Sequence, residues 1–436
     1  MRLVLAVDAA LQSMRMNRSA LRYMATQLAA KAMAAVAQLY AIYVFSKIHA
    51  PNEAALIFIL LGYGIWIQVF EFGISQVIQN GLNTKVLKIS GACRIIVLHY
   101  AIMIIIAMAA ILFSEVLKPL QGGQRNFEAN VDALVFPLGI ALMLVATNNT
   151  LVQRMLLVVN RGMVASKLIL LQSIFSVIVL LIFQWRGADF IESVVIYLSI
   201  PIITYAPLVL RFAGKVWRTR KRRSVNWQWT MENALGFWGL TALSSVYMGA
   251  DYFFAAKHLT DMEMIAYHFS SRVFFISYIA YFSYVQYRAR SITAATHDEH
   301  PKQIWEIVKG AAFIGTLSVA LVLVASVIIV WSGRFDKIVA PGLVVMPLIL
   351  SAALYYCIRV FRDVGLVLIW NLGFQRFLYP LHILEVAFSF LLLNILATEL
   401  GGKGIFFAMA LVAALSTAII YIALCRMSPN FKQIGG

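Results

Sequence analysis

Long apolar runs alternate with short polar segments along the whole chain. The twelve runs fall roughly at residues 23–45, 55–81, 95–113, 133–152, 165–183, 193–210, 233–256, 264–287, 310–331, 341–358, 378–397 and 404–425. Each run approaches the length of about 20 residues with which an α-helix crosses the hydrocarbon core of a bilayer. Strands of a membrane barrel would instead show about ten residues of strict alternation. The pattern therefore predicts an all-α integral membrane protein with about twelve transmembrane helices.

Lysine and arginine in the polar segments orient these helices. With the N-terminus in the cytoplasm, 26 of the 36 Lys and Arg residues fall in cytoplasmic segments and 8 on the opposite side. The cytoplasmic segments in this scheme are 1–22, 85–94, 154–167, 211–223, 288–309, 359–376 and 426–436. Short cytoplasmic loops are enriched in Lys and Arg, so this split predicts that both termini are cytoplasmic and that the number of spans is even.

The longest basic run lies between the sixth and seventh spans and divides the chain into two halves of six. We expect a cytoplasmic N-terminal segment, a six-helix bundle, a basic linker, a second six-helix bundle and a cytoplasmic tail, at residues 1–22, 23–210, 211–232, 233–425 and 426–436. The linker is interpreted as a positive-inside anchor, with specific binding of anionic lipid as the alternative.

Two segments have less certain places. Residues 1–18 favour a short amphipathic helix on the membrane surface. Residues 359–376 either extend the tenth span or lie on the surface.

The composition excludes several classes of protein. Apolar residues make up 62% of the chain and charged residues 13%, which leaves no sequence for a large soluble domain. The net charge of +17 resides in the polar segments rather than on a soluble face, so nucleic acid is not an expected partner. No Walker loop, zinc-binding helix, serine elbow or cysteine motif is present, so we expect no catalytic residues, no cofactor and no metal site. Short outer loops, the longest near 114–132, disfavour a membrane polymerase.

Ionisable residues inside the spans are the candidate functional groups, because they are costly in lipid. Lys31 and Glu71 both lie about 16 Å from the cytoplasmic boundary, at a rise of 1.5 Å per residue. Asp251, His268 and Arg272 lie in the outer third of the seventh and eighth spans. One interpretation is two structural ion pairs that tie neighbouring helices together. The other is a charged lining of a central cavity.

Other polar and aromatic residues in the spans have structural interpretations. His99 and the segment 148–150, which matches a glycosylation sequon, are expected to serve in packing and hydrogen bonding. Glu385, with His382 and Arg376, is either a surface cluster or a site. The eighth span is rich in aromatic residues, including Tyr278, which either pack in the protein or stack on sugar rings.

Two segments carry a resemblance to a known family. Residues 69–83 resemble the second-span signature of polysaccharide-transporter flippases, in which an acid, a glycine and an asparagine recur at the positions of Glu71, Gly73 and Asn80. Residues 247–290 resemble the seventh and eighth spans of the same proteins, where an acid ends one helix and a tyrosine-bearing helix follows. The sequence is therefore similar to the O-antigen and exopolysaccharide flippase branch of the multidrug, oligosaccharidyl-lipid and polysaccharide exporter superfamily.

The resemblance implies two six-helix bundles around a central cavity and transport by alternating access in the bacterial inner membrane. The expected substrate is a polyprenyl-diphosphate-linked oligosaccharide, with Lys31, Arg272, His268 and Tyr278 as substrate-binding candidates. Glu71, Asp251 and Asn80 are candidates for ion coupling or for structural ion pairs. If Glu71 and Asp251 couple ions, they favour the alternative function, a cation-coupled drug or metabolite exporter of the same fold. Expected partners are the lipid-linked oligosaccharide, membrane lipids, a polysaccharide polymerase and a chain-length regulator.

Overall fold

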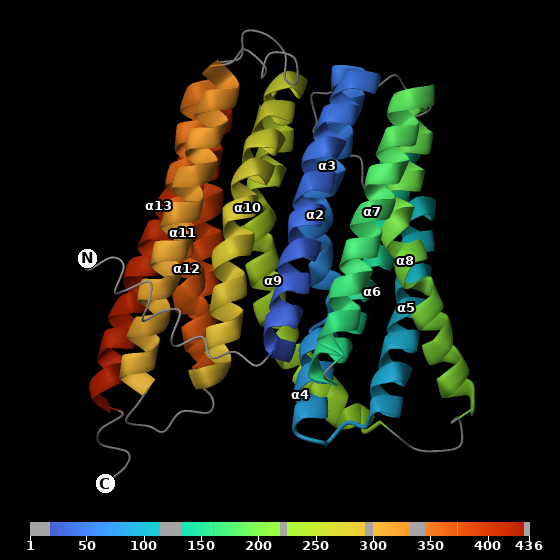
Figure 1. The fold of residues 1–436 in the computed structure, drawn as a ribbon, viewed down its shortest axis with the longest axis vertical. Coiled ribbons are helices and arrows are strands. Elements are labelled where there is room, and N and C mark those ends of the chain that lie inside the picture. The colour runs from blue at the N-terminus through green and yellow to red at the C-terminus, as the bar shows by residue number, and fades with distance from the viewer. Residues whose placement is uncertain are drawn as a thin grey trace.

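The computed structural model describes residues 18–113, 132–159, 161–218, 225–292, 300–331, 345–372 and 374–430. All regular structure in these ranges is helical (Figure 1), which confirms the predicted fold class. The helices are α2 (Arg18–Ile48), α3 (Pro51–Ile67), η1 (Gln68–Glu71), α4 (Ile74–Asn83), α5 (Ile89–Leu112), α6 (Asp132–Val158), α7 (Gly162–Arg186), α8 (Phe190–Arg218), α9 (Trp227–His258), α10 (Asp261–Ile292), α11 (His300–Trp331), α12 (Val345–Asn371) and α13 (Gln375–Asn430). Residues 1–17 of the predicted surface helix, residues 114–131 of the outer loop and residues 219–224 of the basic linker lie outside the described residues.

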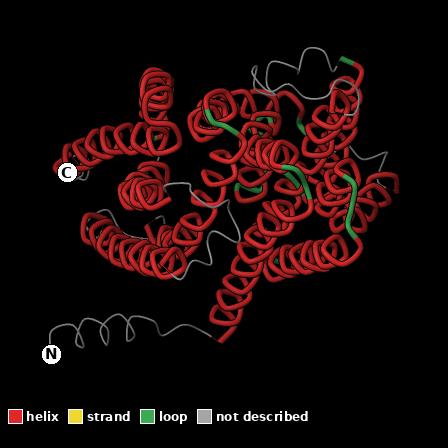
Figure 2. The backbone as a smooth tube through the Cα atoms, turned by 90° about the horizontal axis from the view of Figure 1, so that it is seen from above, coloured by secondary structure: helices red, strands yellow, loops and turns green. Residues whose placement is uncertain are grey.

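The helices gather into two lobes. The N-lobe contains α2 to α8 and the C-lobe contains α9 to α13; they stand side by side, blue to green and yellow to red, in Figure 1. Inside the N-lobe α2 packs on α7, and α5 and α8 pack on α6. Inside the C-lobe α12 and α9 pack on α13, and α10 packs on α11 and α12. Seen from above, the described parts of both lobes are helical throughout, with short connecting loops (Figure 2).

Helix α13 contains two of the predicted spans. Its backbone reverses at Gly401, whose φ of 58° and ψ of −140° lie outside the helical region. Positive φ is open to glycine because it has no Cβ. The two final runs of the sequence therefore form a pair of helices joined by a sharp turn.

The second predicted run, 55–81, was expected to form one helix and is instead broken. α3 passes into the single 3₁₀ turn η1, and α4 starts only after Phe72 and Gly73, which have positive φ of 51° and 69°. A Cβ on Gly73 would lie 2.6 Å from the carbonyl oxygen of Ala234 and 2.7 Å from the backbone nitrogen of Trp238. Both the backbone conformation and the close approach of α9 therefore require glycine here.

Eight described helices are long and apolar enough to cross a membrane by length and composition alone. Helices α9, α10 and α12 fall short of that measure, although their lengths of 32, 32 and 27 residues suffice for a span. These three helices carry Asp251, His268, Arg272, Arg359, Arg362 and Asp363. Helix α12 is continuous to Asn371, so residues 359–371 extend the tenth span and are not a surface segment. Arg359 and Arg362, which the orientation scheme counted as cytoplasmic, therefore lie inside a helix.

Candidate functional site

The break in the second span is stabilised from both lobes. A helix that ends inside the protein leaves carbonyl groups without their usual partners. Trp238 Nε1 of α9 donates to the carbonyl oxygen of Val69 at 2.9 Å, and the Nε2 of His99 on α5 lies 3.1 Å from the carbonyl oxygen of Phe70. A carbonyl oxygen only accepts, so this nitrogen of His99 carries the proton. His99 is therefore a hydrogen-bonded packing residue, as the sequence favoured.

Glu71 lies in this break and is buried, with 7% of its surface exposed. Its carboxyl group contacts the hydroxyl group of Thr150 on α6, and that hydroxyl also lies 2.7 Å from the carbonyl oxygen of Thr147. The described polar partner of the Glu71 carboxyl group is therefore a hydroxyl group of α6 rather than a cation.

The expected pairing of Lys31 with Glu71 does not occur among the ion pairs of the described chain, so this structural interpretation is wrong. Lys31 is half-buried on α2. Asn80 lies near the C-terminal end of α4, where its backbone carbonyl oxygen accepts from the backbone and hydroxyl of Thr84 at 2.9 and 2.8 Å. The three N-lobe candidates thus lie on three different elements, α2, η1 and α4.

The predicted residues of the seventh and eighth spans do lie together, but they are paired differently from the expectation. Asp251 accepts from the hydroxyl of Tyr267 at 2.7 Å and from the backbone nitrogen of Tyr252 at 2.8 Å. Arg272 is not within ion-pair distance of Asp251; its Nη2 donates to the carbonyl oxygen of Leu61 on α3 at 3.3 Å. The second expected ion pair is therefore also wrong. Arg272 spans the contact between the two lobes.

His268 and its neighbours also contribute to the contact between α10 and α3. Its Nδ1 lies 2.7 Å from the hydroxyl of Tyr252, and its ring stacks on Phe58 of α3 at 4.7 Å between centroids. The ring of Tyr252 packs against the backbone of Gly62 on α3, in the space that a side chain at this position would fill. Phe58, Leu61 and Gly62 share one face of α3, because residues three and four apart lie above one another on a helix.

Elsewhere along the contact between the lobes, glycine residues of one lobe pack against aromatic side chains of the other. Gly249 of α9 lies against the indole of Trp66, and Gly81 of α4 lies about 3.0 Å from Trp229, measured from an added Cβ. Small residues let helix backbones approach closely in membranes. The lobes therefore meet along α2, α3, η1 and α4 on one side and α9 and α10 on the other.

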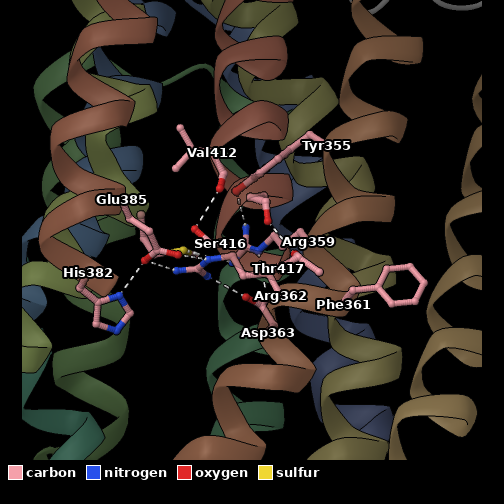
Figure 3. Close-up of polar contacts among 12 residues, drawn as sticks. Tyr355, Arg359, Phe361, Arg362, Asp363, His382, Glu385, Val412, Ser416 and Thr417 are labelled. Atoms are coloured by element: carbon pink, nitrogen blue, oxygen red, sulfur yellow. Dashed lines mark hydrogen bonds and ion pairs between the residues drawn. The ribbon is translucent and has the colours of Figure 1, made fainter. Parts of the chain in front are cut away.

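A buried ionic cluster occupies the interior of the C-lobe (Figure 3). Arg362 of α12 donates from Nε and Nη2 to the two carboxyl oxygens of Glu385 on α13, at 2.6 and 2.8 Å, and from Nη1 to Asp363 at 2.9 Å. His382 Nδ1 lies 2.7 Å from Glu385. Glu385 is 1% exposed, so the surface-cluster interpretation is wrong, and the described contacts of Glu385 do not include Arg376.

Arg359 lies one turn earlier on α12 and has weaker partners. Its Nε donates to Asp363 at 3.1 Å, its Nη1 to the hydroxyl of Tyr355 at 3.3 Å, and its Nη2 to the sulfur of Met248 at 3.6 Å. The ring of Tyr278 lies 5.0 Å from its guanidinium carbon.

Tyr278, expected to contact substrate, is largely a packing residue here. Its ring is stacked between Phe275 and Phe282 at centroid distances of 5.0 and 4.8 Å, and it lies beside Arg359. The aromatic residues of the eighth span thus follow the packing interpretation over this stretch.

Sequence reasoning missed the guanidinium groups of α12. The hydropathy boundary near residue 358 placed them in the segment 359–376, which was expected either to extend the tenth span or to lie on the surface. The signal that could have found them is the spacing of Tyr355, Arg359, Arg362 and Asp363, which places aromatic, basic and acidic groups on one helical face.

Comparisons with known proteins identify the fold. No protein-family model and no curated protein matches the sequence. An inward-facing multidrug resistance transporter of the MATE family and MOP superfamily has a TM-score of 0.65 at 13% identity, over 94% of this chain and 100% of that chain. A mutant of the Vibrio cholerae MATE transporter VcmN has a TM-score of 0.65 at 15% identity, over 94% and 96%. The lipid II flippase MurJ has a TM-score of 0.69 at 11% identity, over 91% and 86%. The chain therefore has the transporter fold shared by MATE proteins and MurJ.

Proposed function

We propose that this protein is a flippase that moves a polyprenyl-diphosphate-linked oligosaccharide across the bacterial inner membrane by alternating access of its two lobes. The oligosaccharide is the repeat unit of an O-antigen, capsule or exopolysaccharide. Both termini lie in the cytoplasm, and a polysaccharide polymerase with its chain-length regulator receives the product on the outer face. The protein carries no catalytic site of its own.

The observation that carries this proposal is the position of Arg272 and the weakness of its polar contact. It stands at the contact between the lobes, partly exposed, and its described polar contact is a long hydrogen bond to the neutral carbonyl oxygen of Leu61. A guanidinium group is a fork of donors that matches phosphate, and charged acceptors form shorter and stronger bonds than carbonyl groups. Arg272 can therefore exchange the carbonyl oxygen for the diphosphate of a lipid-linked substrate.

The energetics of transport agree with an anionic headgroup. The inside-negative membrane potential favours outward movement of negative charge by about 2.3 kcal/mol per charge per 100 mV. The fold is shared with MurJ, which is a lipid II flippase. Lys31 of α2 is a second candidate contact for the diphosphate, and His268 contributes through its hydrogen bond to Tyr252.

Reconstitution in proteoliposomes tests the proposal. Purified protein is supplied with a labelled polyprenyl-diphosphate oligosaccharide in one leaflet, and the fraction that becomes accessible to a glycosidase on the other side is measured. We expect Arg272→Ala to fold normally and to abolish movement, and Arg272→Lys to retain part of it, since lysine keeps the charge and loses the fork. Arg186→Ala is the matched control, because Arg186 is an exposed arginine at the end of α7 whose partner is Glu192 in the first turn of α8. Normal movement by a well-folded Arg272→Ala protein would refute the headgroup role.

The second candidate function is a cation-coupled drug or metabolite exporter of the same fold. It is favoured by Glu71 and Asp251, two buried carboxyl groups whose described partners are hydroxyl groups and a backbone nitrogen rather than cations. The same proteoliposomes separate the two functions. Export of a cationic dye that depends on Glu71 and Asp251, with no movement of the lipid-linked oligosaccharide, would establish this alternative instead.

A further inference from the structure

Two arginines lie one turn apart on α12, and their surroundings differ sharply. Arg362 is saturated by carboxylate oxygens, with three bonds between 2.6 and 2.9 Å. Arg359 has one carboxylate contact, at its Nε, while its two terminal nitrogens contact a tyrosine hydroxyl at 3.3 Å and a thioether sulfur at 3.6 Å. Thioether sulfur is a weak acceptor. The terminal fork of Arg359 is therefore a buried pair of donors without a strong acceptor.

The carboxylate beside Arg359 does not use up its charge. Asp363 accepts from Arg362 at 2.9 Å through one oxygen, and from Arg359 and the hydroxyl of Tyr281 through the other, at 3.1 and 3.0 Å. Its charge is thus divided among three donors. It also contacts the Nε edge of Arg359, which leaves the terminal fork on the opposite edge for another acceptor.

The neighbours of this fork stand on the helices that contact the N-lobe. Met248 belongs to α9 and Tyr278 to α10, and both side chains are partly exposed. Helices α9 and α10 are the two C-lobe elements that meet α3. To reach the terminal nitrogens of Arg359, a ligand held between the lobes would displace the sulfur of Met248, the hydroxyl of Tyr355 and the ring of Tyr278.

We propose that Arg359 is a second anion-binding residue, whose terminal fork takes one phosphate group of a diphosphate while Arg272 takes the other. This inference rests on the proposed function for its substrate class, and it adds a residue of α12 that was not among the candidates from the sequence. Arg362 is excluded from this role, because its nitrogens already hold Glu385 and Asp363. Of the two arginines of α12, Arg359 thus binds the ligand and Arg362 stabilises the interior of the C-lobe.

The test measures binding of polyprenyl diphosphate, without sugar, to the purified full-length protein in lipid nanodiscs. Inorganic pyrophosphate and polyprenyl monophosphate are run beside it, so that a free phosphate source is separated from a lipid headgroup. We expect Arg359→Gln to weaken diphosphate binding by about 10-fold to 100-fold, the usual effect of losing a charge-assisted contact, and Arg359→Lys to weaken it less. We expect monophosphate binding to change less than diphosphate binding in the same variants.

A second variant keeps every arginine, so that a loss of binding cannot be explained by misfolding after the removal of Arg359. Met248→Glu places a carboxylate where the sulfur now contacts Arg359, so the fork is occupied from within and the protein remains folded. We expect this variant to lose diphosphate binding while its matched control Met248→Gln, of the same size and without the charge, retains it.

Wild-type diphosphate binding by folded Arg359→Gln, or by Met248→Glu, would overturn the inference. If Arg272→Ala still abolishes binding in that case, the proposed function stands without Arg359. If the wild-type protein binds none of the three phosphate compounds, both proposals fall.

Discussion

Removal of Arg362 is the most informative perturbation of the C-lobe. Arg362→Ala deletes three charge-assisted hydrogen bonds and leaves Glu385, 1% exposed, with His382 as its described partner. Asp363 keeps Arg359 and Tyr281. Breaking a buried ion pair on one side costs about 3–5 kcal/mol, because the remaining charge is stranded away from water. We expect Arg362→Ala to lower the free energy of unfolding by that amount.

The assay is a double-mutant cycle on the apparent free energy of unfolding, measured by titration with a denaturing detergent. Arg362→Met combined with Glu385→Leu removes both charges and fills the space with apolar atoms, so we expect the pair to cost less than the sum of the single changes by at least about 2 kcal/mol. Arg186→Ala is the control, since an exposed pair is worth about 0–1 kcal/mol. Single changes that add within about 0.5 kcal/mol would refute the assigned contact.

Other expectations follow from the break in the second span and from the charge pattern. Gly73→Ala should destabilise the protein by more than about 1 kcal/mol, since it combines positive φ with a clash against α9, and a lowered melting temperature checks this. Trp238→Phe should cost about 1–3 kcal/mol, because a buried carbonyl loses its donor; an unchanged melting temperature would contradict this. Glu71→Gln should melt closer to the wild-type temperature than Glu71→Ala, because glutamine keeps a side-chain oxygen that can accept from Thr150; equal losses in both variants would count against this contact. Cysteine labelling should place the 211–232 loop in the cytoplasm and the 114–132 loop outside, and labelling of both from one side would contradict the topology.

The positions of the helices could be predicted from the sequence because each span requires a long apolar run, and such runs are visible in one dimension. The break at residues 68–73 could not be predicted in this way. The run 55–81 stays apolar across it, and its cause is the close approach of α9 to Gly73, a contact distant in sequence. The resemblance of this segment to a family signature marked the place without revealing the geometry.

Depth estimates explain the two wrong ion pairs. Counting residues gives the height of a side chain along a helix, but not its direction around the helix axis. Lys31 and Glu71 share a height, as do Asp251 and Arg272, yet Glu71 contacts Thr150 and Arg272 contacts Leu61. Partners of buried charges therefore need helix packing as well as depth.

The ionic cluster of the C-lobe has a consequence for how the chain enters the membrane. Helix α12 is not apolar enough for a span by composition, and each arginine or aspartate at the centre of a helix costs about 2.5–3.5 kcal/mol to insert. The carboxylate that neutralises Arg362 is Glu385, 23 residues later on α13. Helix α12 should therefore wait at the insertion machinery until the first half of α13 is synthesised, and the two should pass into lipid together. Truncation after residue 372 should then leave α12 outside the bilayer, whereas truncation after residue 400 should let it enter.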